Sequence, residues 1–381
     1  MLGVIYSPVK AFKEIVKKPS IKGPLLIFLL FLLATAGAQY VSASKIVVET
    51  GTPEGDDWTE STSLWTPEGV SIDDADKVVG NYSVTSSVTN DSVWMRITGI
   101  GSFNCSAEKG YKALSFRIKW IHQNETFPSS NATLRLFSGD ESRYFALDLM
   151  NLINVSDTWA NLTVNLGSSD QDWLSVNSPD WVNITGLEFE LAWLASDAAN
   201  LTMKIDDLYF GKHVPYIARD AFTGWFVGSL ANTAFSFFLG WSLYSVLLLL
   251  TIKLSRSEAG PWSVLFIVIG YTFSIRIVHL LVDAFLVSML PQLVFPLKAW
   301  NPIPGEEGLA SKLIDDIYQA SWYPSLAYNL SLFLMFAVHA WIIALSTIAI
   351  HFLREFTWKK AAFISITAYF IYIFVRGFLG I

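Results

Sequence analysis

The segment Ser7–Tyr40, SPVKAFKEIVKKPSIKGPLLIFLLFLLATAGAQY, sets the orientation of this 381-residue chain. Five lysines lie in its first half (Lys10, Lys13, Lys17, Lys18, Lys22), and the next run, residues 24–38, carries no charge. Lysines beside an apolar segment stay on the cytoplasmic side of a membrane. The segment therefore predicts a cytoplasmic basic segment over residues 1–22, a first membrane span over 23–43, and a location outside the cell for the residues after this span.

The first apolar run has two interpretations. A basic region, an apolar region and the triplet at residues 36–38, Ala-Gly-Ala, are typical of a cleavable signal peptide. The basic region here is longer than that of a signal peptide and carries its own helical pattern in Phe12, Ile15 and Val16. We favour an uncleaved signal anchor, and cleavage stays the alternative.

The composition divides the chain into two kinds of sequence. Overall, 52% of residues are hydrophobic and only 15% are charged, against roughly 25% charged in a soluble domain. Residues 45–213 hold 24 acidic and 11 basic side chains, whereas the remainder holds 9 and 15. The acidic part would repel phosphate, so the sequence excludes nucleic acid as a partner. The single cysteine, Cys105, excludes an internal disulfide framework.

Four further apolar runs are long enough to cross a bilayer, which takes roughly 20 residues. They lie within a membrane region over residues 218–381, at about 222–252, 262–290, 325–353 and 361–379. With the N-terminus inside, the loops that carry Lys253 and Lys359 also lie inside, as the positive-inside rule requires. The sequence predicts a five-span protein of the cell membrane, with its C-terminus and the acidic loop over residues 306–316 outside.

The segment 44–213 has a different pattern. Apolar and polar residues alternate in short runs rich in β-branched and aromatic side chains, which is typical of strands. The clearest runs are residues 92–98, 113–120, 132–137, 185–191 and 201–210. We predict an all-β sandwich of about eight strands. The predicted fold class is thus a membrane α-helical bundle of five transmembrane helices with an all-β jelly-roll sandwich ectodomain.

Nine Asn-x-Ser/Thr triplets lie in the same segment, which agrees with a location outside the cell and with N-glycosylation. Compositional bias of a β-domain is the alternative explanation for any one of them. The candidate asparagines are Asn81, Asn90, Asn104, Asn124, Asn131, Asn154, Asn161, Asn183 and Asn200.

The opening SPVKAFKEIVKKP (residues 7–19) resembles the start of prokaryotic members of the Yip family, the five-span Ypt/Rab-interacting group. The loop KLSRSEAGPWS (253–263), the start of the next span, Trp341 and the segment KAAFISI (360–366) are similar to the second half of that family. The resemblance covers about 1–43 and 218–381 and implies a scaffold in the lipid bilayer. The Gly-Gly turn of the family is replaced here by SEAG.

Five stretches of the β-segment resemble carbohydrate-binding modules of the galactose-binding-like jelly roll. They are residues 78–84, 111–120, 157–166, 181–189 and 203–211. The resemblance implies a sandwich that binds glycan or another surface protein. It also implies a structural calcium ion, with Glu49 or Glu54 and Asp206 or Asp207 as oxygen ligands. The alternative is that Asp206 and Asp207 only end a strand.

Exposed aromatic rings are the natural platform for sugar rings. Trp173 and Trp181 flank a polar, serine-rich loop and are the candidate platform. Other tryptophans lie in strand patterns and are expected in the core, because each buries a large area. These are Trp94, Trp120, Trp159 and Trp193.

The third predicted span contains Arg276, His279 and Asp283, whose spacing of three and four places them on one helical face. Charged groups inside a bilayer cost roughly 2.5–3.5 kcal/mol each on insertion scales, so they should pair and face the bundle interior. His339 in the fourth span is a candidate partner. A structural interhelical ion pair is favoured over a proton or ion path.

The sequence contains no Ser/His/Asp or Cys/His arrangement, phosphate loop or zinc-ligand spacing. We therefore predict a non-enzymatic integral membrane protein whose outer sandwich binds glycan or protein. The alternative is a transport or sensory subunit that uses the Arg, His and Asp side chains within the membrane.

Overall fold

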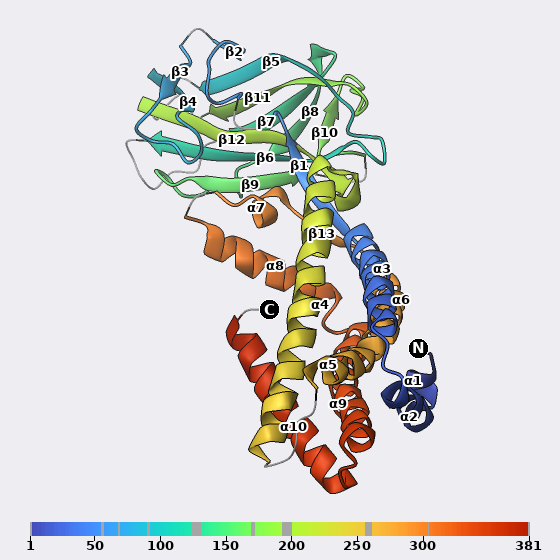
Figure 1. The fold of residues 1–381 in the computed structure, drawn as a ribbon. Helices are drawn as coiled ribbons and strands as arrows, with labels where there is room; N and C mark the ends of the chain where they lie inside the picture. The colour runs from blue at the N-terminus through green and yellow to red at the C-terminus, as the bar shows by residue number, and fades with distance from the viewer. Residues whose placement is uncertain are drawn as a thin grey trace. The chain divides into compact units, whose positions relative to one another are not determined.

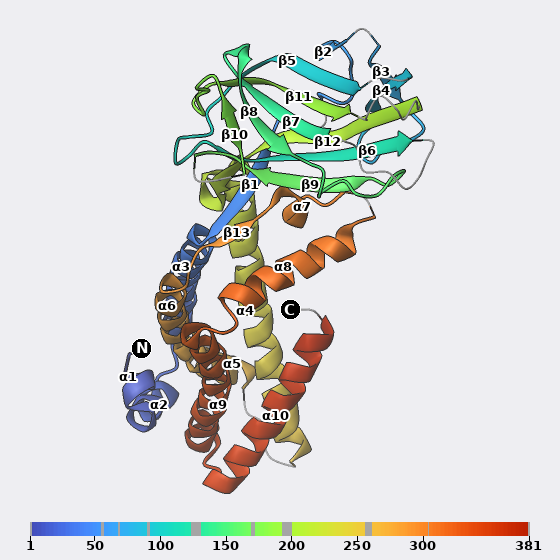
Figure 2. The same ribbon diagram turned by 180° about the vertical axis from the view of Figure 1, so that it is seen from behind.

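The computed structural model describes every residue except 1, 55–56, 68, 90–91, 123–130, 169–171, 193–199, 256–260, 304 and 380–381. The chain divides into two compact units, drawn from opposite sides in Figures 1 and 2. The helical unit comprises Met1–Ile46, Pro215–Leu293 and Asp315–Ile381. The sandwich unit comprises Val47–Val214 together with Val294–Ile314. The segment 294–314, which the sequence placed in a loop between two spans, is thus part of the β-sandwich unit.

The sandwich consists of two antiparallel sheets. Its strands are β1 (Ile46–Thr52), β2 (Trp65–Thr66), β3 (Ser71–Asp73), β4 (Ser83–Thr89), β5 (Val93–Phe103), β6 (Tyr111–His122), β7 (Asn131–Ser138), β8 (Asp140–Asp148), β9 (Ala160–Asn165), β10 (Leu174–Val176), β11 (Ile184–Ala192), β12 (Asn200–Pro215) and β13 (Leu293–Phe295). Sheet A has the order β13-β1-β12-β4-β3, and β6 pairs with both β12 and β9. Sheet B has the order β10-β8-β7-β11-β5-β2. The predicted all-β sandwich is confirmed.

Alternation of side chains builds the core between the sheets. In β6 the residues Leu114, Phe116 and Ile118 are buried, and in β11 the same is true of every second residue from Leu187. Phe116 of sheet A meets Phe189 of sheet B edge to face, with ring centroids 4.9 Å apart. Because successive residues of a strand point to opposite faces, the residues between these belong to the outer faces of the sheets.

The segment 294–314, called the connector below, lies against sheet A. It contains α7 (Leu297–Trp300), which both views place beside β9. The backbone N–H of Leu297 donates to Glu49 Oε2 at 2.9 Å, and the indole N–H of Trp300 donates to the Glu49 carbonyl at 2.9 Å. Glu306 accepts two hydrogen bonds of 2.9 Å from Arg117 Nη2. The connector is therefore fixed to β1 and β6 by buried polar contacts.

The helical unit contains α1 (Leu2–Tyr6), α2 (Pro8–Lys17), α3 (Lys22–Ser44), η1 (Tyr216–Ala218), α4 (Asp220–Leu254), α5 (Trp262–Gly270), η2 (Tyr271–Ser274), α6 (Ile275–Ser288), α9 (Leu326–Arg354) and α10 (Trp358–Leu379). Helix α8 (Glu307–Ser321) begins in the sandwich unit and ends in the helical unit. Five helices of the described chain are long and apolar enough to cross a membrane, as predicted. They are Lys22–Ser44, Asp220–Leu254, Trp262–Ser288, Leu326–Arg354 and Trp358–Phe378.

The third of these helices is interrupted by the 3₁₀ turn η2. Just before the turn, a Cβ on Gly270 would lie 2.6 Å from the Trp241 ring and 2.7 Å from Pro24. Only glycine permits this approach of α3, α4 and α5. The Trp241 ring stacks on Phe266 at 4.1 Å and donates its indole N–H to the Phe266 carbonyl. The close contact lies directly before the point where the chain leaves regular α geometry.

The basic N-terminal segment is folded as α1 and α2. Phe12 of α2 is fully buried in the core of the helical unit, as the helical pattern of the sequence indicates, whereas the lysines of α2 are exposed. The Tyr271 hydroxyl donates to the Ser20 carbonyl at 3.2 Å. The N-terminal segment is therefore part of the helical unit rather than a separate tail.

Candidate functional site

The outer face of sheet B gathers charged and aromatic side chains from four neighbouring strands. Register places Arg96 opposite Glu188, and Glu188 opposite Arg135, in one row across β5, β11 and β7. Trp94 lies on β5 two residues before Arg96. Tyr144 lies on β8 opposite Phe137, which follows Arg135 by two residues on β7. We call this set the sheet B face. Its members are Trp94, Arg96, Arg135, Phe137, Glu141, Tyr144, Glu188 and Glu190.

Glu188 is the hub of the sheet B face, with only 3% of its side chain exposed. Its carboxylate accepts from Arg96 Nε at 2.7 Å and also from Arg135. Arg135 further donates to Glu190, and Arg96 to Glu141. Burial alone would lower the pKa of Arg135, but Glu190 and Glu188 raise that pKa above its ordinary value. Each guanidinium is thus held in a fixed orientation by two carboxylates.

The arginines also lie over aromatic rings. The Arg96 guanidinium is 5.2 Å from the centres of both the Trp94 and Phe137 rings, and that of Arg135 is 5.7 Å from Tyr144. Gly186 makes room for Phe137, because a Cβ on Gly186 would lie 3.3 Å from the Phe137 ring and 2.8 Å from the Ile97 carbonyl. The result is a rigid surface of flat rings and oriented donors and acceptors, with Trp94 and Tyr144 partly open to solvent.

This face was missed from the sequence, although the signal was present. Trp94 was expected in the core because it lies in a strand, yet it alternates with the apolar residues Val93 and Met95. Since alternate residues point to opposite faces, Trp94 must share a face with Arg96 rather than with the core. The expectation for Trp94 was therefore wrong.

Trp173 and Trp181 do not form the exposed platform that was expected. Their exposed fractions are 9% and 8%, and both belong to the core of the sandwich. The Trp181 ring stacks on Phe145 at 3.8 Å and meets Trp173 edge to face at 5.5 Å. The indole N–H of Trp173 donates to the Asn165 carbonyl. Both rings have no open face, because the drive to bury large aromatic area outweighs the polarity of the adjacent loop.

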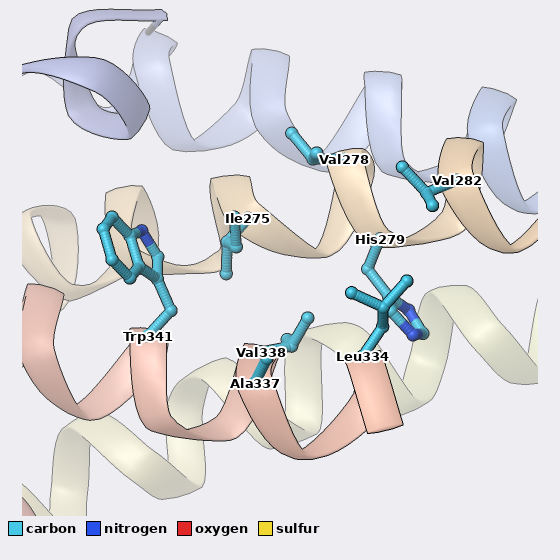
Figure 3. A pocket seen from close by; sticks show the side chains of 8 residues that line it. All are labelled: Ile275, Val278, His279, Val282, Leu334, Ala337, Val338 and Trp341. Atoms are coloured by element: carbon cyan, nitrogen blue, oxygen red, sulfur yellow. The ribbon is translucent and has the colours of Figure 1, made fainter. Parts of the chain in front are cut away.

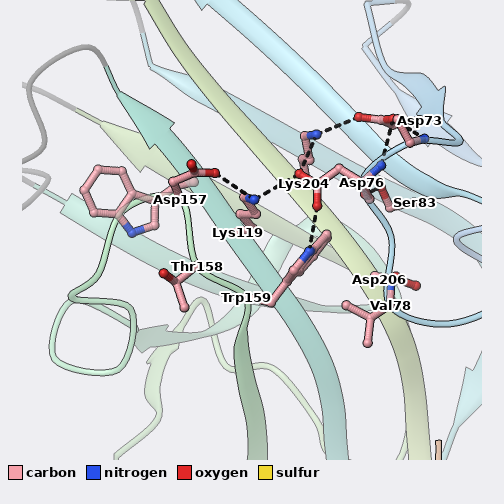
Figure 4. A network of polar contacts seen from close by, with 12 residues as sticks. Asp73, Asp76, Val78, Ser83, Lys119, Asp157, Thr158, Trp159, Lys204 and Asp206 are labelled. Atoms are coloured by element: carbon pink, nitrogen blue, oxygen red, sulfur yellow. Dashed lines mark hydrogen bonds and ion pairs between the residues drawn. The ribbon is translucent and has the colours of Figure 1, made fainter. Parts of the chain in front are cut away.

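Sheet A carries a second polar cluster on its outer face (Figure 4). Lys204 donates to Asp73 at 2.6 Å and to Asp76 at 2.8 Å. Lys119, opposite Lys204 on β6, pairs with Asp76 at 3.1 Å and with Asp157 at 2.7 Å. Burial alone would raise the pKa of Asp76, but hydrogen bonds from Lys204, Lys119 and the Trp159 indole lower it to about 2.

The charged and hydrogen-bonding groups of this cluster are paired with one another. Both lysines are largely buried and face carboxylates, and the indole N–H of Trp159 is used by Asp76 at 3.0 Å. Trp159 is half-buried on the outer face, not in the core as expected; Trp120 is in the core, and Trp193 lies outside the described residues. The cluster is suited to stabilising the sheet rather than to binding a ligand.

The predicted calcium ligands are engaged in other contacts. The buried Asp206 carboxylate accepts from the backbone N–H groups of Val78, at 2.5 Å, and Asp207, at 2.7 Å. Asp207 faces Arg117 at 3.6 Å and Lys298 at 3.7 Å, and burial raises the pKa of Asp207. Glu49 is buried under the connector, and Glu54 is exposed.

These donors do not fit a calcium site. A calcium ion bound by Asp207 would lie next to the positive charges of Arg117 and Lys298. The Asp206 carboxylate already accepts hydrogen bonds from backbone N–H groups. Among the described residues, no group of three or more His, Cys, Asp or Glu side chains could hold a metal ion. Calcium binding was implied by the resemblance alone, and the contacts of Asp206 and Asp207 argue against it.

The polar residues of the third apolar helix have separate partners in the structure. Asp283 accepts a hydrogen bond from Ser331, and His339 shares one with the Tyr369 hydroxyl at 2.6 Å. The Arg276 guanidinium lies 4.9 Å from the Phe273 ring. No ion pair between Arg276 and Asp283 occurs in the described chain, so the predicted pairing of the trio is not observed.

His279 lines an apolar pocket of about 180 Å³ between α6 and α9. Figure 3 shows His279 and Trp341 at opposite ends of it, with aliphatic side chains between them. The Nε2 atom of His279 is buried without a hydrogen-bond partner from any described residue. The lining residues are Ile275, Val278, His279, Val282, Leu334, Ala337, Val338 and Trp341.

The described sequon asparagines lie mostly at the surface. Asn104 is half-buried and its side chain accepts backbone N–H bonds from Ser106 and Ala107, and Asn161 contacts Lys298. Asn90 and Asn124 lie outside the described residues. The exposed ones are Asn81, Asn131, Asn154, Asn161, Asn183 and Asn200. Their glycosylation remains a prediction.

No protein-family model matches the chain, and no curated protein matches it. Among solved structures, it is similar to the non-crystalline cellulose specific carbohydrate-binding module CBM28, with 12% identity, a TM-score of 0.28, and coverage of 43% of this chain and 97% of that one. It is similar to the family 11 carbohydrate-binding module from Clostridium thermocellum in complex with a β-1,3-1,4-mixed-linked tetrasaccharide (16% identity, TM-score 0.26, 42% and 94% covered). An exo-β-agarase structure is similar at 12% identity and TM-score 0.27, with 42% and 24% covered.

Proposed function

We propose that this chain is a non-enzymatic, membrane-anchored glycan-binding protein. In this proposal the sandwich, of the jelly-roll kind, lies outside the cell and binds an oligosaccharide on the sheet B face. The five apolar helices form a Yip-like scaffold that holds it at the membrane. The observation that carries the proposal is the row Arg96–Glu188–Arg135 with Trp94 and Tyr144 on either side of it.

The chemistry of this row suits a sugar. Neighbouring hydroxyl groups of a sugar both donate and accept, and a guanidinium held by carboxylates offers fixed donors beside fixed acceptors. Aromatic rings offer flat apolar faces for the C–H groups of the sugar ring. Because the groups are held by Glu188 before binding, little conformational entropy is lost on binding.

The dimensions and charge of the face narrow the ligand class. Trp94 and Tyr144 are separated by three strand spacings across the sheet and by four residues along the strands. At the usual strand spacing and rise this gives a distance of roughly 20 Å. Such a distance suits an oligosaccharide rather than a single sugar. The face holds two guanidiniums and three carboxylates, so a neutral glycan is favoured over an acidic one.

The test is a glycan array probed with the full chain in detergent, followed by titration of the best glycan against variants. We expect Trp94→Ala and Tyr144→Ala to weaken binding about tenfold each, as for aromatic anchors of other interfaces. Trp159→Ala is the matched control, because Trp159 is also half-buried on an outer face but lies directly before β9 of sheet A. Equal weakening by Trp159→Ala, or full binding by both sheet B variants, would reject the proposed face.

A further inference from the structure

One end of the helical unit holds a partly buried guanidinium, two of whose nitrogen atoms have no partner among the described residues. Arg354 is the last residue of α9. Its Nε and Nη2 atoms are buried and have no hydrogen-bond acceptor from the described part of the chain. Burying guanidinium nitrogens that face no acceptor is unfavourable. Arg354 is therefore suited to an anionic ligand that would lie at the end of the helix bundle.

The turn after Arg354 brings further positive charge to the same end. Glu355 adopts a left-handed conformation (φ 51°), and the Trp358 ring stacks on His351 at 3.9 Å. These contacts form a tight turn between the two helices, so that α10 begins beside the end of α9. Lys360, in the first turn of α10, lies 4.4 Å from the Phe356 ring. The N-terminus of a helix attracts anions through its unpaired N–H groups.

Helix α2 adds a third source of cations. Lys13 lies over the ring of Phe352, at 5.3 Å, which places α2 next to the last turn of α9. The apolar face of α2 packs on the bundle through Phe12 and Ile15, so its charged face is left exposed. Cations at this end include Lys10, Lys13, Lys17, Lys18, Arg354, Lys359 and Lys360, and the acids there include Glu14 and Glu355, both exposed.

We propose that this end of the helical unit binds the phosphate of an anionic phospholipid, with Arg354 as its specific contact and Lys13 and Lys360 beside it. A guanidinium matches phosphate in shape and charge. The helices that end here are apolar enough to span a bilayer, and α10 exposes large apolar side chains near this end, such as Trp358 and Phe363. A phospholipid can meet both kinds of surface at once, whereas free phosphate meets only the cations. The proposal concerns the helical unit and does not depend on glycan binding.

The test is native mass spectrometry of the full chain released from zwitterionic detergent, after addition of phosphatidylglycerol or phosphatidylcholine. We expect the wild type to retain phosphatidylglycerol at least about tenfold better than phosphatidylcholine, the scale of a charge-assisted contact. Arg354→Gln should remove most of this preference. Lys109→Gln, which removes the same charge from an exposed position of the sandwich unit, should leave it nearly unchanged, and Arg354→Lys should restore only part of it.

Two controls separate binding from folding and lipid from free phosphate. Arg354→Gln should melt at the wild-type temperature or above in detergent alone, because it removes a partly buried charge whose Nε and Nη2 atoms have no described partner. Phosphatidylglycerol should raise the melting temperature of the wild type but not of this variant. Equal lipid retention by wild type and Arg354→Gln would overturn the proposal. Equal protection by millimolar inorganic phosphate would also overturn it, in favour of a site for free phosphate.

Discussion

The polar cluster on sheet A allows a quantitative prediction for Asp76→Asn. The pKa of Asp76 is lowered from 3.8 to about 2 in the folded chain. At about 1.4 kcal/mol per pKa unit, this corresponds to roughly 2–3 kcal/mol of stability. The Asp76 side chain is 29% exposed, so solvent screening reduces the effect to about 1–2 kcal/mol. We expect Asp76→Asn to destabilise the sandwich by this amount at pH 7.

The pH dependence is set by the direction of the shift. Because the folded pKa lies below the ordinary value, the contribution of Asp76 is complete above about pH 4 and is lost as the pH falls to about 2. The difference in stability between the wild type and Asp76→Asn should therefore narrow across this window. Urea unfolding of the full chain in detergent, followed through hydrogen exchange of the β6 and β12 amides, measures it.

Asp157→Asn is the matched control for this experiment. Asp157 also pairs with Lys119, at 2.7 Å, but its side chain is 70% exposed. Exposed ion pairs contribute little, so this variant should change stability by less than about 0.5 kcal/mol. Equal effects of the two substitutions, or a difference between wild type and Asp76→Asn that persists unchanged to pH 2, would refute the reasoning.

Three further predictions concern the sandwich. The buried Cys105 thiol, whose pKa burial raises to about 12, should react with iodoacetamide at pH 8 only after unfolding; rapid labelling of the folded chain would contradict its burial. Glu306→Ala should destabilise the sandwich by about 3 kcal/mol, because it removes one carboxylate partner of the buried Arg117. Unfolding curves that match the wild type would contradict this and show that Asp207 alone stabilises the Arg117 charge. Calcium and a chelator should leave the melting temperature unchanged, and a calcium-dependent rise that Asp206→Asn and Asp207→Asn together abolish would contradict this.

Local patterns in the sequence predicted much of the fold. The alternating runs at 92–98 and 113–120 became β5 and β6, and the apolar runs became helices of the expected length. These features depend on the period of apolar residues along the chain, which is visible in a short window. Strand β1 and the packing of the connector against sheet A were not predicted.

The features that the sequence did not reveal depend on contacts between distant residues. Glu49 and Leu297 are hydrogen-bonded although 248 positions separate them, and no local pattern marks either residue. The sheet B face is an intermediate case. Each strand shows its own alternation, but the row formed by Arg96, Glu188 and Arg135 depends on strand order and register, which are set by the packing of the whole sandwich.

The division of the chain at the connector has a consequence for synthesis and for proteolysis. Because the sandwich unit takes in residues 294–314, the polypeptide passes between the two units four times, near positions 46, 214, 293 and 314. After β12 has been synthesised, roughly eighty more residues must be added before the connector can pack against sheet A and cover Glu49. Once it has closed, a single cut at any one of the four passages leaves the sandwich covalently attached. A shedding protease would have to cleave on both sides of the main segment, and the connector would still hold the released part by its buried contacts.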